Sequence, residues 1–243
     1  MRRLLLLGSV ALAVAAPASL NAQDGFLFRQ PTVTLGVHGG LAVPSAHDDI
    51  FDFFTRELTL ERSDFASASF GAEIGVRIAS HFDVVLGVSH AKASQPSEFL
   101  HWEDTDEQPI EQVTTFKRTP VTLSARYFPL DRGRDVGRYA WIPAAVLPYV
   151  GAGVGMLWYD LLQAGDFVDF TTLEIFRDRL RSSGSTVTAQ VFAGAQWWPL
   201  AHVGLTTEGR YAWANATLEN GFSEFGSIDL NGFQWTAGIA ARF

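Results

Sequence analysis

The C-terminal segment alternates between apolar side chains and polar or small ones with a period of two residues. Successive side chains of a β-strand point to opposite faces, so this pattern predicts a strand with one apolar wall and one polar or thin wall. The apolar set is Phe233, Trp235, Ala237, Ile239, Ala241 and Phe243. The same alternation occurs in seven earlier segments: 32–41, 69–78, 82–89, 121–127, 150–159, 186–197 and 203–213.

The connections between these eight segments alternate between long and short. Long connections cover 44–64, 93–111, 163–184 and 218–232, and short ones cover 79–81 and 199–202. After Gln23 no apolar run reaches the 18 residues of a spanning helix, so a helical membrane protein is excluded. An even number of alternating strands with long and short loops predicts an all-β, closed antiparallel transmembrane β-barrel of eight strands. A ten-stranded barrel, in which 53–62 forms an extra hairpin arm, is the alternative.

Two soluble folds also alternate in polarity. A β-sandwich has shorter strands, and its solvent face carries Lys and Glu, whereas here the second face is mostly Gly, Thr, Ser and Ala. A lipocalin-like barrel turns its apolar face inward around a ligand. Aromatic residues at the strand ends favour a lipid-facing apolar wall. We expect Phe82, Tyr127, Tyr149, Trp197 and Phe243 at the periplasmic edge, and Trp158, Trp213, Trp235 and Phe70 at the outer edge.

The first residues are typical of an export signal. Arg2 and Arg3 precede an apolar stretch of about 13 residues, and small residues follow up to Ala22. This stretch is too short for a spanning helix. We therefore expect 1–22 to be a signal peptide and 23–243 to form the barrel domain.

Taken together, these features resemble the eight-stranded outer-membrane β-barrel family of the OmpA/OmpX type. The final Gly238–Phe243 is similar to the terminal assembly signal of that family, and 148–155 is similar to one of its strand openings. The resemblance implies a bacterial outer-membrane location, lipid and lipopolysaccharide as neighbours, and reading of Phe243 by the barrel-assembly machinery. It carries over no catalytic residue. The connection 129–147 is longer than the periplasmic turns of the family.

Charged and amide side chains recur on the face opposite the apolar wall. Eight strands enclose a space that side chains can fill, and buried charges are tolerated when they are paired. We expect an internal network of ion pairs and hydrogen bonds, with a narrow solute or proton path as the alternative. Its predicted members are Glu73, Arg77, Asp83, Arg126, Gln190, Glu208, Arg210, Gln234 and Arg242.

The predicted surface loops are acidic, and two of them hold apolar clusters. A solvated surface is the simplest interpretation of the carboxylates, and capture of a cationic partner is the functional one. Ile50, Phe51, Phe53 and Phe54 lie in the first loop, and Phe167, Phe170, Leu173, Phe176 and Leu180 lie in the third. The third cluster is compatible with an amphipathic helix on the lipid, with packing over the barrel mouth, or with an adhesive patch.

Several functions are disfavoured. A net charge of −8 provides no surface for nucleic acid, and the absence of cysteine excludes thiolate chemistry. No Gly-x-Ser-x-Gly or His-Glu-x-x-His motif occurs, so we expect no enzyme, metal or cofactor. The expected role is structural, in envelope integrity or in surface interaction through the acidic loops, with an unknown extracellular ligand. A small-solute channel is the alternative.

Overall fold

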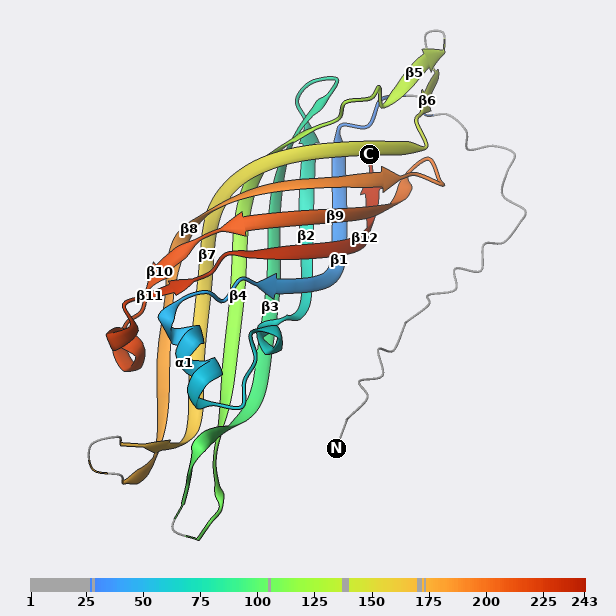
Figure 1. Ribbon diagram of the computed structural model, residues 1–243. Coiled ribbons are helices and arrows are strands. Elements are labelled where there is room, and N and C mark those ends of the chain that lie inside the picture. Colours follow the sequence, from blue (N-terminus) through green and yellow to red (C-terminus); the bar gives the residue numbers. More distant parts are fainter. Residues whose placement is uncertain (1–26, 28, 105, 137–139, 170–171, 173) are drawn as a thin grey trace.

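Eight antiparallel strands close into a ring in the computed structural model, which describes residues 27, 29–104, 106–136, 140–169, 172 and 174–243 (Figure 1). Each strand pairs with its neighbours in the ring, and β1 pairs with β12 to close it. The strands are β1 (Val33–Pro44), β2 (Ser67–Arg77), β3 (Phe82–Glu103), β4 (Pro109–Tyr127), β7 (Val146–Val168), β8 (Ile175–Trp197), β9 (Val203–Trp213) and β12 (Gly232–Arg242). The prediction of eight strands is confirmed, and the ten-stranded alternative is wrong.

The closing register explains why the last residues matter for the ring. Leu35 lies opposite Ala241, and the amide of Phe243 donates to the carbonyl of Val33 over 2.9 Å. Segment 53–62, the proposed extra arm, instead contains the end of the helix α1 (Asp49–Glu57). The predicted signal peptide, 1–22, lies outside the described residues.

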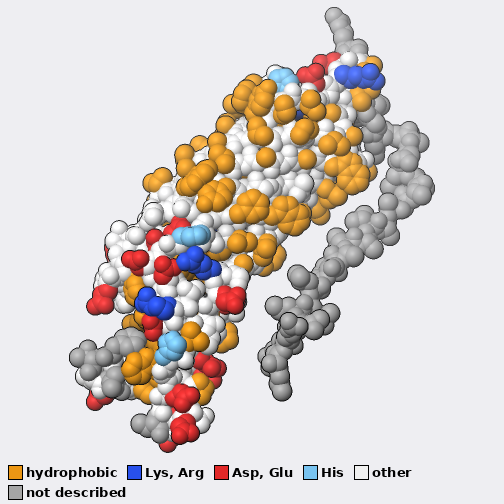
Figure 2. Space-filling model, in the orientation of Figure 1, with side chains coloured by type: hydrophobic (Ala, Val, Ile, Leu, Met, Phe, Trp, Pro, Cys, Tyr) orange, Lys and Arg blue, Asp and Glu red, His pale blue; other side chains and the backbone are white. Residues whose placement is uncertain are grey.

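The apolar face of the ring points outward. Val37, Phe70 and Val187 are 61%, 68% and 66% exposed, and they share this face with the other apolar residues of their strands. Figure 2 shows hydrophobic side chains as a broad band on the visible face, whereas most charged side chains in that view gather toward the lower left end of the molecule. A lipocalin-like arrangement with the apolar face inward is therefore wrong for this chain.

The two ends of the barrel differ in construction. The turn end, as we call it, holds the short β2–β3 and β8–β9 connections, the C-terminus and a hairpin of β5 (Gly133–Val136) and β6 (Ala140–Pro143) (Figure 1). This hairpin accounts for the unusual length of the 129–147 connection. The opposite end, the loop end, holds the four other connections.

Four strands extend past the rest of the ring toward the loop end. β3, β4, β7 and β8 contain 22, 19, 23 and 23 residues, compared with 11 or 12 in the other four. Most of the predicted loops 93–111 and 163–184 is therefore strand. The amphipathic helix considered for the third loop is wrong for its described residues, because Phe167 lies on β7 and Phe176 and Leu180 lie on β8.

An apolar core closes the loop end. It forms where the helix α1 and the short elements η1 (Arg62–Phe65), β10 (Asn215–Thr217), η2 (Asn220–Phe225) and β11 (Ser227–Asp229) pack on the inner face of the long strands. We call this the loop-end core. It includes Ile50, Phe51, Phe54, Phe65, Leu218 and Phe222 from the connections and Phe116, Leu157, Tyr159 and Leu161 from the strands. Three residues of the first apolar cluster, Ile50, Phe51 and Phe54, are thus buried over the barrel mouth.

Among the described residues, no helix is both long enough and apolar enough to span a membrane.

Candidate functional site

The middle of the lumen holds a compact group of charged side chains. The guanidinium of Arg126 donates to both carboxylate oxygens of Glu73 over 2.9 and 3.0 Å, and it reaches Glu208 at 3.5 Å. Glu208 also accepts from Arg210 over 2.6 Å and from the Tyr149 hydroxyl over 3.1 Å. We call these five residues the central network. Two guanidiniums face two carboxylates, so the layer is close to neutral.

Aromatic rings fix the central network in place. The Arg126 guanidinium lies 4.4 Å from the ring centre of Tyr149 and 5.9 Å from that of Phe192. These rings fit because glycines face them: a Cβ on Gly194 would come within 2.7 Å of the Tyr149 ring, and one on Gly151 would collide with Phe192. The inward glycines at this level therefore make room for aromatic rings, and the rings and the ion pairs occupy the lumen there, beside a cavity of about 10 Å³.

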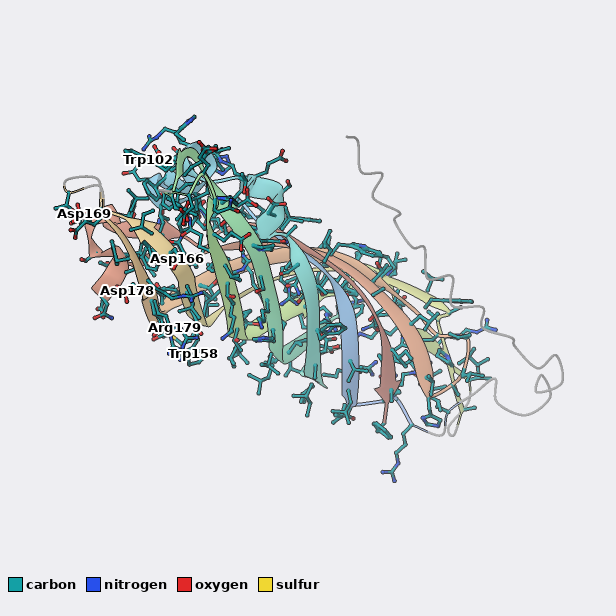
Figure 3. The ribbon with its side chains drawn as sticks, turned by 90° about the horizontal axis from the view of Figure 1, so that it is seen from below. Trp102, Trp158, Asp166, Asp169, Asp178 and Arg179 are labelled. Carbon is teal, nitrogen blue, oxygen red and sulfur yellow. The ribbon has the colours of Figure 1, made fainter. Side chains whose placement is uncertain are left out.

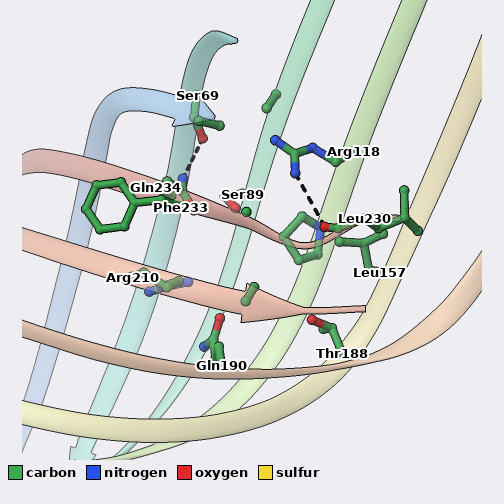
Figure 4. A pocket seen from close by; sticks show the side chains of 15 residues that line it. Ser69, Ser89, Arg118, Leu157, Thr188, Gln190, Arg210, Leu230, Phe233 and Gln234 are labelled. Atoms are coloured by element: carbon green, nitrogen blue, oxygen red, sulfur yellow. Dashed lines mark hydrogen bonds between the residues drawn. The ribbon is translucent and has the colours of Figure 1, made fainter. Parts of the chain in front are cut away.

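Above the central network, toward the loop end, lies a cavity of about 50 Å³ (Figure 4). Arg118 projects into it and donates to the carbonyl of Leu230 at 3.5 Å. Gln190, on β8, also lines this cavity, and its amide donates to Thr122 and Ser124 of β4 over 3.1 and 2.9 Å. Because the loop-end core lies directly above, this cavity is capped on that side.

A third group of charges lies at the turn end of the lumen. Arg132, from the β4–β7 connection, donates to Asp83 over 2.7 Å. Arg77 and Arg242, the last residues of β2 and β12, line the same small cavity. The apolar part of its wall consists of Pro31, Phe128, Trp141, Leu147 and Trp198.

The predicted lumen residues thus fall into separate groups. Glu73, Arg126, Glu208 and Arg210 meet in the central network, whereas Arg77, Asp83 and Arg242 meet at the turn end. Gln190 and Gln234 face the upper cavity, where Gln234 donates to Ser69 over 2.6 Å. Sequence reasoning missed Tyr149, Arg118 and Arg132. Arg118 lies an even number of residues from Arg126 on β4, so both side chains point inward. Extending the predicted strand 121–127 toward its N-terminal side would have identified Arg118 as a lumen residue.

The structure places most of the predicted interface aromatics on the outer face. Phe82, Tyr127 and Trp197 lie outward at the turn end, where Phe82 and Tyr127 form a cross-strand pair with ring centres 4.9 Å apart. Trp158, Trp213 and Trp235 are about half exposed toward the loop end. Tyr149 is the exception: it is only 3% exposed and lies in the lumen, so its assignment to the interface is corrected.

Charged residues appear on the outer face beyond Trp158. Asp160 accepts from Lys117 over 2.9 Å and from Arg181 over 2.8 Å. Burial alone would raise the pKa of Asp160, but the hydrogen bonds from Arg181 and Lys117 outweigh it and hold that pKa below its ordinary value. Figure 3 shows Trp158 together with Asp166, Asp178 and Arg179 of the same hairpin. Asp160 thus marks where the outer face changes from apolar to charged.

Within the described ranges, no group of three or more His, Asp or Glu side chains is arranged to hold a metal ion.

Known proteins resemble this chain in structure and not in sequence. No protein-family model and no curated protein matches the sequence. The outer membrane protein OprG from Pseudomonas aeruginosa is 12% identical, with a TM-score of 0.50 over 89% of this chain and 99% of that one. Neisserial surface protein A is 13% identical, with a TM-score of 0.49 over 90% and 98%. The chain therefore has the fold of the eight-stranded outer-membrane β-barrels.

Proposed function

We propose that the protein is a non-conducting barrel of the bacterial outer membrane that serves envelope integrity and surface interaction. The turn end faces the periplasm and the loop end faces outward, with lipid and lipopolysaccharide around the apolar band. The observation that carries the proposal is the double closure of the lumen. The central network occupies its middle, beside a cavity of about 10 Å³, and the loop-end core closes its mouth at the loop end.

Conductance tests the closed lumen against the small-solute channel. Purified mature protein inserted into planar bilayers should give no steady conductance, because a solute would have to displace paired, buried charges. A matched variant with Arg126→Ala and Tyr149→Ala removes two side chains of the central network from the lumen and leaves the outer face unchanged. Neither protein should conduct while the loop-end core is intact. Steady conductance by the unaltered protein would establish the channel instead.

The surface that we propose for interaction is the tip of the β3–β4 hairpin. Glu98 and Glu111 lie directly opposite each other across the two strands, and Glu103, Asp104, Asp106 and Glu107 follow toward the turn. Like charges directly opposite destabilise a strand pair, so this arrangement favours a role in binding over a role in folding. Its chemistry fits a cationic partner.

Binding to immobilised poly-lysine tests this role. The refolded barrel should bind, and binding should weaken as salt rises, because exposed charges are screened. Glu98→Gln with Glu111→Gln should weaken binding severalfold. Asp166→Asn is the matched control, since Asp166 lies on the neighbouring hairpin 3.6 Å from Arg177. Equal binding by all three proteins contradicts the proposal.

Cell fractionation and gel migration test the proposed location in the outer membrane, and a Phe243 variant tests the proposed assembly signal. The protein should fractionate with outer membranes and migrate differently in detergent gels before and after boiling. Phe243 lies exposed at the turn end, and its recognition by the assembly machinery stays a prediction. Phe243→Ala should lower the amount of folded protein in the membrane. We also expect no enzymatic activity.

A further inference from the structure

Three arginines converge on one small cavity at the turn end of the lumen. Arg77 comes from β2, Arg132 from the β4–β7 connection and Arg242 from β12, and all three line a cavity of about 20 Å³. They are close enough to interact electrostatically, Arg77 with Arg132 and Arg242 with Arg77. The fold therefore brings together three like charges from distant parts of the chain.

Positive charge is in excess at this cavity. Among the described residues that line it, Asp83 is the only carboxylate, and it accepts from Arg132. Arg77 donates to the side-chain oxygen of Gln30 over 2.7 Å, and Arg242 donates to the carbonyl of Ala201 over 2.7 Å. These neutral acceptors satisfy hydrogen bonds but do not neutralise charge. The central network differs, because its guanidiniums and carboxylates are equal in number.

Each of the three guanidiniums also has a buried nitrogen without an acceptor. These are Nε of Arg77, Nε of Arg132 and Nη2 of Arg242. Arg242 is only 4% exposed, so water reaches its guanidinium poorly. Leaving a buried charged donor unsatisfied is costly, and an acceptor in the cavity would remove that cost.

Aromatic rings hold the guanidinium planes in position before any ligand arrives. Arg242 lies 4.0 Å from the ring centre of Trp198 and 5.8 Å from that of Trp141, and Arg132 lies 4.0 Å from that of Phe128. Planar guanidiniums bind carboxylate and phosphate oxygens through paired hydrogen bonds. A cluster fixed in this way loses little conformational freedom when it binds an anion.

We propose that this cavity is an oxyanion site, which accepts the oxygen atoms of a phosphate or carboxylate group entering from the turn end. A cavity of this size holds about one or two water molecules. The oxygen atoms of the group therefore enter while the rest of the ligand stays outside. The site is independent of the loop end and of any partner bound there.

Anion exchange at constant ionic strength tests the proposal. Sodium phosphate, and in a second arm sodium acetate, replaces sodium chloride around the refolded full-length mature barrel. Binding should change the tryptophan emission, because Trp198 stacks on Arg242, and should raise the thermal midpoint. The arm with the larger response identifies phosphate or carboxylate as the preferred chemistry. No response in either arm overturns the proposal.

Three variants separate binding from a structural role. Arg242→Gln should weaken the apparent affinity by about tenfold or more, since it removes a charge-assisted bond. Without phosphate or acetate, the same variant should unfold at an equal or higher temperature, because mutual repulsion is relieved. Arg77→Gln provides the same test if the first variant does not fold. Arg134→Gln, on the exposed β5 of the same connection, should behave like the unaltered protein. An unchanged anion response in both Arg242→Gln and Arg77→Gln contradicts the proposal.

Discussion

Arg126 is the residue on which the charge balance of the lumen depends. It is 2% exposed and contacts both Glu73 and Glu208, so its removal leaves two carboxylates buried around a vacant position. Breaking a buried ion pair from one side costs about 3–5 kcal/mol, whereas an exposed pair contributes about 0–1 kcal/mol. Arg126→Ala should therefore lower the free energy of unfolding in urea far more than Lys117→Ala, which breaks a partly exposed pair and leaves Asp160 in contact with Arg181. Equal losses would mean that the lumen is hydrated at this level.

Tyr149 shows how a single residue at a strand start can be assigned to the wrong face. The sequence places it beside the interface aromatics, but it has the parity of Gly151 and Gly153 and hence points inward. Its hydroxyl donates to Glu208, and a hydrogen bond to a charged group contributes about 1.5–3 kcal/mol. Tyr149→Phe should cost about that much, and Tyr127→Phe, on the outer face, about 0.5 kcal/mol or less. The comparison is made by urea unfolding followed by tryptophan fluorescence.

At the scale of the element, β7 reverses its polarity along its length. From the turn end up to Trp158, the outward residues are apolar, among them Val150 and Val154. Beyond Trp158 the outward residue is Asp160, and Leu161 is buried inside. The strand thus changes from a lipid-facing wall to the wall of a water-facing domain. The predicted strand 150–159 ends at this reversal, because the alternation that defines it follows one apolar face, and 163–184 is predicted as a loop.

Because the outer face changes from apolar to charged, the free-energy cost of an arginine on β8 should depend on whether it lies within or beyond the apolar band. Ala193 and Ser183 are both exposed on the outer face, but Ser183 lies beyond the apolar band, opposite Asp160. An arginine at the middle of the bilayer costs about 2–4 kcal/mol, and one near the interface costs about 0–1 kcal/mol. Ala193→Arg should therefore destabilise the folded barrel in lipid vesicles, and Ser183→Arg should leave it nearly unchanged. If the two variants unfolded alike, the boundary would have to be placed elsewhere.

For the whole molecule, the sequence was sufficient to predict the ring of strands. It was not sufficient to predict the loop-end core or the arginine cluster at the turn end. Alternation is a local property, so it identified all eight strands and the inward position of Arg126 and Glu208. The loop-end core depends on contacts between segments far apart, such as the edge-to-face pair of Phe54 and Phe222. The turn-end arginines come together only when β2 and β12 are placed around the closed ring. Neither arrangement leaves a periodic pattern in the sequence.

The molecule therefore contains two apolar regions, one on the outside of the ring and one inside the loop end. We expect the loop-end core to unfold without unfolding of the ring. The apolar band of the ring faces outward, whereas the loop-end core is enclosed by its own polypeptide. Phe54 is fully buried in that core, and truncating a buried Phe costs about 3–5 kcal/mol. Phe54→Ala should raise amide hydrogen exchange in α1 and η2, while β1 and β12 keep their protection and the gel shift on boiling persists. Arg56→Ala, exposed on the same helix, should change neither. Simultaneous loss of protection in β1 and in α1 would show instead that the barrel and its seal form one cooperative unit.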